Sequence, residues 1–277
     1  MPSKPADARL VTPSASESRD RTLFVKGLSK VFLSADGPIA ALDHINLTIP
    51  AGEFIAILGP SGCGKSTLMA IMAGLEPASA GQVQLGGVAV TSPVLEAGFM
   101  FQRDLLLDWR TCEDNILLQF QMRGQSGAPH RERARELLSL VGVSQFAQRH
   151  PRELSGGMRQ RVALCRALVH DPPLLFMDEP FGALDALTRE NLNLELSRIA
   201  HHSGTTVVLV THSIDEAVFL ADRVVVMSSR PGHIVGEVRI NLPRPRENVF
   251  RELPEFVEGA ARLRGLLTHD ARERDDG

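Results

Sequence analysis

The sequence predicts an α/β protein with a parallel sheet covered on both faces, an antiparallel β subdomain and an inserted helical subdomain. The later part of the chain alternates helical patterns with short, nearly unbroken apolar strands at residues 174–177, 206–210 and 223–227, as strands buried on both faces do. The first third is instead rich in β-forming segments, at residues 22–32, 43–49, 53–58 and 82–90. Residues 104–160 have a helical pattern and interrupt the predicted parallel sheet.

Turn chemistry and apolar spacing support individual elements of this fold. Gly86 and Gly87 are expected to form the hairpin turn within residues 82–90, because adjacent glycines supply the positive φ angles of such turns. In the insertion, an apolar stripe with i, i+3, i+4, i+7 spacing predicts a helix with its buried face at Ala134, Leu137, Leu138 and Val141. A later helix is expected to bury Leu192, Leu196 and Ile199.

Composition excludes several classes of protein. Of the 277 residues, 43% are hydrophobic, and 30 Lys and Arg oppose 33 Asp and Glu, so a net charge of −3 disfavours a polycation for nucleic acid. No apolar run reaches the roughly 18–20 residues that span a bilayer, and the first 20 residues lack the apolar core of a secretory signal. Three cysteines with no CxxC pair argue against a disulfide framework or a zinc site. A cytoplasmic globular protein is expected.

Both ends of the chain differ in composition from its centre. Residues 1–20 are rich in Ser, Pro and Ala and are expected to be disordered. Residues 21–250 are expected to form the globular domain, with the helical subdomain at about 104–160. Residues 251–277 are expected to form a C-terminal helix and a charged, solvated tail.

A phosphate-binding loop follows the strand predicted at residues 53–58. Residues 59–67 fit the pattern GxxxxGK[ST] between a strand and a helix, which is where that pattern binds nucleotide phosphates. Glycines let backbone N–H groups converge on phosphate oxygens, and the helix N-terminus adds its positive dipole end. Lys65 can reach the β- and γ-phosphates, and Ser66 can bind Mg²⁺. The candidate ATP-binding residues here are Gly59, Pro60, Ser61, Gly62, Cys63, Gly64, Lys65, Ser66 and Thr67.

Two carboxylates end the apolar strand predicted at residues 174–177. At the carboxyl end of a parallel strand beside a phosphate loop, Asp178 is placed to hold Mg²⁺, directly or through water. Glu179 is expected to polarise the attacking water. An apolar strand that ends in two acids is weak evidence for a catalytic site by itself. The presence of the phosphate loop in the same sequence strengthens this interpretation.

Residues 154–158, Leu-Ser-Gly-Gly-Met, precede this strand. They distinguish between the classes of nucleotide-binding protein that have a phosphate loop. Ser155 is a helix N-cap type, and Gly156 and Gly157 leave the first amides of the next helix open to an anion. That helix is expected to face inward with Val162, Cys165 and Val169 and outward with Arg159 and Arg166. The element resembles the LSGGQ signature of ATP-binding subunits of ABC transporters, with Met158 in the last place.

The resemblance extends over roughly residues 21–240 and implies a P-loop NTPase core of the ABC ATPase type. Gln102 resembles the glutamine that senses Mg²⁺ and water, and His212 resembles the switch histidine that contacts the γ-phosphate. Residues 182–185, which end in Asp185, resemble the D-loop at the dimer interface. Phe32 takes the place of the aromatic residue that stacks on adenine, since the chain has no Tyr. ATP and Mg²⁺ are the implied cofactors, with Ser66, Gln102 and Asp178 around the metal.

The same resemblance implies partners. It predicts a head-to-tail dimer, of this chain with itself or with a related ATPase, in which Ser155, Gly156 and Gly157 complete the partner's ATP site. It also implies an integral membrane permease, a substrate-binding protein that acts indirectly, and a location on the cytoplasmic face of the inner membrane. The permease is expected to dock at residues 102–115, with apolar anchors at Leu105, Leu106, Leu107 and Trp109, although these side chains could equally form the core of the helical subdomain.

Residues 177–189 and the stretch after Gln102 look most like ATPases of nitrate, sulfonate and taurine importers. A soluble ABC ATPase in translation or DNA repair is the alternative. Such translation factors carry two cassettes and such repair proteins a long coiled coil, whereas this chain has one phosphate loop and no sustained heptads. A simple P-loop kinase would lack residues 154–158. The ATPase subunit does not touch the transported solute, so the sequence does not identify it.

Overall fold

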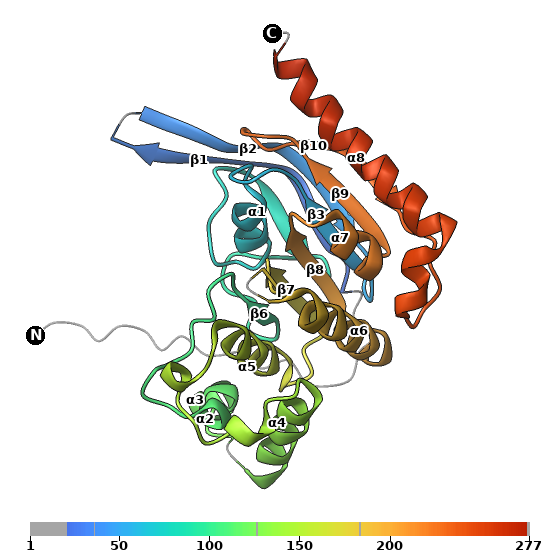
Figure 1. The fold of residues 1–277 in the computed structure, drawn as a ribbon. Helices are drawn as coiled ribbons and strands as arrows, with labels where there is room; N and C mark the ends of the chain where they lie inside the picture. Colours follow the sequence, from blue (N-terminus) through green and yellow to red (C-terminus); the bar gives the residue numbers. More distant parts are fainter. Residues whose placement is uncertain (1–20, 36, 126, 183, 276–277) are drawn as a thin grey trace, which may run out of the picture.

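The computed structural model describes residues 21–275 except 36, 126 and 183, and describes side chains up to residue 268. The prediction of disorder for residues 1–20 and the tip of the predicted charged tail lie outside these residues. Two sheets form the framework (Figure 1). The six-stranded sheet has the order β10-β9-β3-β8-β7-β6, and the four-stranded sheet has the order β2-β1-β4-β5.

The parallel sheet lies where the alternating pattern predicted it. Its parallel strands are β3 (Phe54–Leu58), β6 (Gly98–Met100), β7 (Leu174–Asp178), β8 (Thr206–Thr211) and β9 (Arg223–Met227), and β10 (Ile234–Arg239) pairs antiparallel with β9 at one edge. Every residue of β3, β7, β8 and β9 is buried, as expected for strands covered on both faces.

The antiparallel sheet is built from the N-terminal third. Its strands are β1 (Leu23–Ser34), β2 (Gly37–Ile49), β4 (Ala80–Leu85) and β5 (Val88–Ala89). Gly86 and Gly87 have φ angles of 57° and 78° between β4 and β5, which confirms the predicted hairpin turn. The expected strand at residues 43–49 begins earlier, at Gly37, because the long β1–β2 hairpin extends the pairing to Ser34 and Gly37.

Side-chain alternation along β3 divides the protein into two cores. Ile55 and Ile57 pack with α1 (Lys65–Met72) and the antiparallel sheet. Phe54, Ala56 and Leu58 face the opposite core. That core is completed by residues of α5 (Gly156–Leu168), α6 (Ala186–Ser203), α7 (Ile214–Leu220) and α8 (Pro254–Asp275), the last lying along the outside of the molecule (Figure 1).

The helical insertion lies below the sheet in Figure 1. It contains α2 (Cys112–Ile116), α3 (Leu118–Met122), α4 (Ala128–Leu140) and the short 3₁₀ helices η1 (Ser144–Phe146) and η2 (Pro151–Glu153). The predicted apolar stripe on α4 is buried at all four positions, Ala134, Leu137, Leu138 and Val141. A third 3₁₀ helix, η3 (Asn248–Glu252), precedes α8. In the described part of the chain, no helix is both long and apolar enough to cross a bilayer.

Candidate functional site

The phosphate loop joins β3 to α1, as the motif predicts. Gly64 precedes α1 with a φ of 103°, and a Cβ there would lie 2.8 Å from the Ala41 carbonyl oxygen, so the turn requires glycine. Lys65 is buried, and its Nζ donates to the carbonyl oxygens of Gly59 and Pro60, both at 2.9 Å. The loop therefore folds around the ammonium group and concentrates positive charge at its centre.

Ser66 and Asp178 meet at the carboxyl edge of the sheet. Ser66 Oγ donates a 2.9 Å hydrogen bond to Asp178 Oδ1, although the two residues are 112 positions apart. Burial raises the pKa of the Asp178 carboxyl above its usual value; the Ser66 hydrogen bond lowers that pKa, Glu179 raises it and Lys65 lowers it. A hydroxyl and a carboxylate at this spacing are the hard oxygen ligands that Mg²⁺ prefers, so the pair fits the predicted metal site.

Glu179 lies where two predicted catalytic residues converge. Gln102 Nε2 donates to Glu179 Oε2 at 3.3 Å, and His212 Nδ1 lies 3.4 Å from Glu179 Oε1. The backbone of Glu179 has a φ of 46°, and its N–H donates to the Val210 carbonyl at 2.8 Å. This sparsely populated conformation turns the chain sharply after β7. The two neighbouring carboxylates therefore meet different partners, Ser66 for Asp178 and Gln102 for Glu179.

A cavity of about 410 Å³ connects these groups with Phe32. Phe32 faces it from β1 together with Ile39 and Ala41 from β2, and Gln102 and Glu179 line it beside the phosphate loop. Ile39 and Arg230 also line the cavity, although no sequence motif predicts them there. Arg230 donates to the Gly62 carbonyl at 3.2 Å. Only the register of the β1–β2 hairpin reveals Ile39, which pairs directly with Phe32.

The signature residues do not line this cavity among the described residues. Ser155 is the N-cap of α5, and its Oγ accepts a 3.3 Å hydrogen bond from Met158 N, as predicted. A Cβ on Gly157 would lie 2.8 Å from Leu184 Cδ2, so this glycine lets the 182–185 segment approach closely. Asp185 caps α6 by accepting from Thr188 N at 3.0 Å. Ala183, in the predicted D-loop, lies outside the described residues.

Two arginines of α5 correct a prediction. Arg159 and Arg166 were expected to face outward, but both bind the segment after Gln102. Arg159 Nε donates to Asp104 Oδ2 at 2.9 Å, and Arg166 donates to the Leu105 carbonyl at 2.8 Å and the Asp104 carbonyl at 2.6 Å. Burial lowers the pKa of Arg166. The helix periodicity could not reveal this, because the arginines' partners come from a loop 55 to 62 residues earlier.

The same segment presents apolar side chains to solvent. Leu105 is 54% exposed and Trp109 is 74% exposed, so neither is part of the core of the helical insertion. Leu106 and Leu107 are half-buried, and Leu106 packs against the larger core. Of the four expected anchors, two therefore form an exposed surface.

Comparison with known proteins agrees with this geometry. The sequence model of the ABC transporter family matches residues 42–182. An uncharacterized ABC transporter ATP-binding protein of Methanocaldococcus jannaschii is 44% identical over 91% of this chain and 94% of its own length. The chain belongs to the ABC transporter ATP-binding proteins. It is an ATPase of this family that binds ATP.

One further relative and two solved structures show more specific similarities. The aliphatic sulfonates import ATP-binding protein SsuB of Bacillus cereus is 40% identical over 85% of this chain and 92% of its own length. A dimeric structure of MJ0796, a bacterial ABC transporter cassette, matches with a TM-score of 0.73 and 32% identity over 80% of this chain and all of that one. A dimeric post-hydrolysis structure of the same cassette with ADP and phosphate has a TM-score of 0.73 and 31% identity, with the same coverage.

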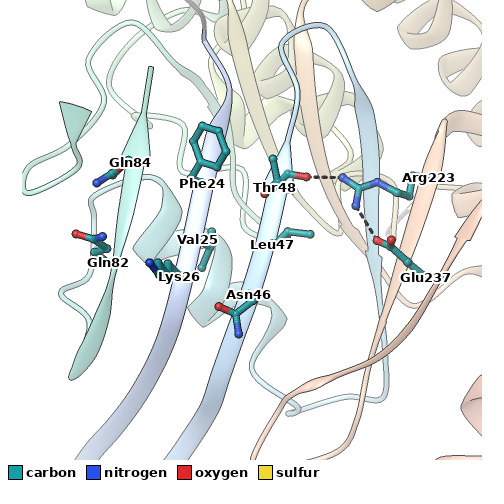
Figure 2. Close-up of a pocket in the computed structure, with 10 residues that line it drawn as sticks. All are labelled: Phe24, Val25, Lys26, Asn46, Leu47, Thr48, Gln82, Gln84, Arg223 and Glu237. Atoms are coloured by element: carbon teal, nitrogen blue, oxygen red, sulfur yellow. Dashed lines mark hydrogen bonds and ion pairs between the residues drawn. The ribbon is translucent and has the colours of Figure 1, made fainter. Parts of the chain in front are cut away.

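A larger hollow of about 730 Å³ shares no lining residue with the cavity beside the phosphate loop. It is lined by residues of β1, β2 and β4, with Arg223 and Glu237 at one side (Figure 2). Arg223 donates to Glu237, to both carboxylate oxygens of Glu53 and to the Thr48 carbonyl, so these charges join the two sheets. No phosphate-loop residue lines this hollow.

Glu216 is a buried acid that the sequence analysis missed. It faces a cavity of about 40 Å³ shared with Glu179 and His212, and burial raises the pKa of its carboxyl. Thr211 Oγ1 donates to Glu216 Oε2, and Oε1 has no hydrogen-bond partner among the residues that the structure describes. The capping pattern Ser213-x-x-Glu216 was the available signal. Ser213 indeed caps α7 by accepting from Glu216 N.

Replacing the buried carboxyl of Asp178 should change how stability depends on pH. Because its pKa is raised, the folded protein keeps this proton to a higher pH than the unfolded chain does. The resulting stabilisation is complete below the unfolded pKa and is lost as pH rises through the folded pKa. Asp178→Asn should therefore raise the denaturation midpoint at pH 7, with the gain vanishing below about pH 4.

Urea unfolding from pH 3.5 to pH 7 measures this effect. Asp43→Asn, which changes an exposed carboxyl on β2, serves as the control and should show no comparable gain. A gain for Asp178→Asn that is equal at every pH would mean that ionisation of Asp178 is not its cause.

Proposed function

We propose that this ATPase is the ATP-hydrolysing subunit of an importer for a small anionic or organic solute, with an aliphatic sulfonate the first candidate. A separate integral membrane permease carries the solute, and the ATPase binds that permease at the cytoplasmic face of the membrane. The convergence of Gln102 and His212 on Glu179, beside the Ser66–Asp178 pair, supports hydrolysis. The names of the sulfonate importer relatives support import.

ATP enters the cavity that Phe32 and the phosphate loop line. The adenine ring stacks on Phe32, whose side chain is 38% exposed, and the phosphates lie over the loop with Lys65 neutralising their charge. The Ser66 hydroxyl and the Asp178 carboxylate would hold Mg²⁺, with Gln102 as a further candidate ligand. When bound, such an ion would supply positive charge against the phosphate oxygens.

Hydrolysis depends on the position of Glu179. Its carboxylate polarises the attacking water, while Gln102 and His212 fix its orientation through the two contacts described above. When two subunits close around bound ATP, as proposed below, His212 also contacts the γ-phosphate. Phosphoryl transfer requires mainly positioning and charge stabilisation, so removing one group should affect one step.

Glu179→Gln should keep ATP binding and lose turnover. The amide preserves the shape of the side chain but cannot accept the proton of the water, so hydrolysis should fall at least about 100-fold, the scale of general-base catalysis. ATP binding is measured by equilibrium titration and hydrolysis by phosphate release. Glu132→Gln, an exposed change on α4, is the control. Near-normal hydrolysis by Glu179→Gln would assign the role of the base to another residue.

We propose that the working unit is a head-to-tail dimer. Ser155 and Gly157 lie at the N-terminus of α5, outside the cavity that contains Lys65, so they can enclose a γ-phosphate only from a second subunit. The dimeric structures of the related MJ0796 cassette support this arrangement. Each bound ATP then becomes part of the interface, and its hydrolysis opens the dimer.

Mixing two inactive variants tests the shared site. Lys65→Ala removes the cation of the phosphate loop, and Ser155→Arg places a bulky charge at the signature helix. Each chain should be inactive alone. A mixed dimer retains one intact composite site of two and should recover up to about half of the wild-type activity per mixed dimer, in line with the symmetry of the pair. Inactive mixtures that demonstrably contain mixed dimers would contradict the arrangement.

The exposed surface formed by Leu105 and Trp109 is our proposed permease contact. Aromatic side chains at interfaces contribute much of the binding energy, and Trp109 is the more exposed of the two. The start of this segment is held to α5, because Arg159 and Arg166 bind Asp104 and Leu105, and a helix from the permease is the occupant that we expect for the surface.

Trp109→Ala should weaken assembly with the permease about 10-fold or more, as expected for a central aromatic contact. Co-purification with the permease and uptake of an aliphatic sulfonate measure the effect, while ATPase activity of the isolated subunit should persist. Val88→Ala removes an equally exposed apolar residue on β5 and serves as the control. Full assembly and uptake with Trp109→Ala would exclude this residue from the contact.

A further inference from the structure

Lys30 is a buried lysine on the strand that carries Phe32. Its exposed fraction is 7%, although the four residues that follow it on β1, 31–34, are exposed. β1 pairs with β2 through the register Lys30 with Leu42 and Phe32 with Ile39, and the register shifts between Lys30 and Val31. This irregularity lets the side chains of Lys30 and Phe32 meet near the cavity while the hairpin continues beyond them.

Three contacts fix the ammonium group of Lys30. Its Nζ donates to Glu76 Oε1 at 2.5 Å and to the Pro77 carbonyl at 2.7 Å, in the segment between α1 and β4. The same Nζ lies over the Phe32 ring, 4.8 Å from its centroid. The positive charge is thus held against one face of the aromatic ring by groups outside the hairpin.

The geometry leaves the other face of Phe32 for the nucleotide. Phe32 lines the cavity next to the phosphate loop, whereas Lys30 does not. Lys30 is only 7% exposed whereas Phe32 is 38% exposed, so the part of the ring that the buried cation covers is not the part that is open to the cavity. A cation over one face is attracted to the ring and holds it in place. A ring that is already fixed loses less conformational freedom when a purine stacks on its open face.

We propose that Lys30 is a positioning residue that sets the affinity of the ATPase for the purine base, acting through Phe32. This inference rests on the proposed stacking of the base on Phe32. A tyrosine could also fix its ring by a hydrogen bond through its hydroxyl, but a phenylalanine has no polar atom. Here the ammonium group of Lys30, anchored by Glu76, supplies that constraint from behind the ring.

A double-mutant cycle tests the proposal. Lys30→Met keeps the length of the side chain and removes the charge. It should weaken ATP binding about three- to tenfold, the scale of a partly desolvated cation–π contact. In a Phe32→Leu background, the same substitution should change ATP affinity by less than about twofold, because the ring on which the cation acts is gone. ATP binding is measured by calorimetry on the full chain.

Controls separate this role from a loss of fold. Lys26→Met removes an exposed lysine on the same strand and should leave ATP affinity unchanged. Lys30→Arg retains a cation over the ring and should restore most of the affinity. Binding of inorganic tripolyphosphate, measured by competition with ATP, has no base contribution and should be equal in wild-type and Lys30→Met protein.

Each outcome decides a different question. If Phe32→Leu does not weaken ATP binding, stacking on Phe32 is wrong and the role of Lys30 is overturned with it. If Phe32→Leu weakens binding but Lys30→Met does not, only the role of Lys30 is overturned. An equal loss from Lys30→Met in both backgrounds, or a loss that extends to tripolyphosphate, would show that Lys30 acts on the fold or the phosphates and would also overturn the proposal.

Discussion

The hydrogen bond between Ser66 and Asp178 is the contact on which the site depends. It joins the end of β3, through the phosphate loop, to the end of β7, and these strands lie on either side of β8 in the sheet. All three strands are parallel, so their carboxyl ends share one edge. Glu179 and His212 follow two of these strands directly. The chain therefore gathers its chemistry at one edge because the sheet's order leaves no other arrangement.

The sequence predicted the parts of this site that local chemistry determines. The phosphate loop, the acids after β7 and the N-cap Ser155 each depend on neighbours within a few residues, and the structure places them as expected. Periodicity predicted the buried face of α4 for the same reason. The functional roles of these residues stay predictions, because geometry alone does not measure catalysis.

Long-range contacts account for what the sequence did not predict. Arg159 and Arg166 read as solvent-facing positions of a helix, yet their partners come from the loop after β6. Ile39 lines the cavity only because the hairpin register places it opposite Phe32. A lysine in a strand is usually exposed, but Glu76 and Pro77 bind the ammonium group of Lys30 and bury it. Hydrophobic patterning does not specify which polar groups a distant segment will bring.

The position of α5 has a mechanical consequence. Ser155 caps its N-terminus, and Arg159 and Arg166 on the same helix bind the loop that exposes Leu105 and Trp109. A helix of 13 residues is about 20 Å long and resists bending. Because the two arginines join the loop to the helix, a displacement of the loop is transmitted along α5 to its N-terminus at Ser155, with no element unfolding on the way.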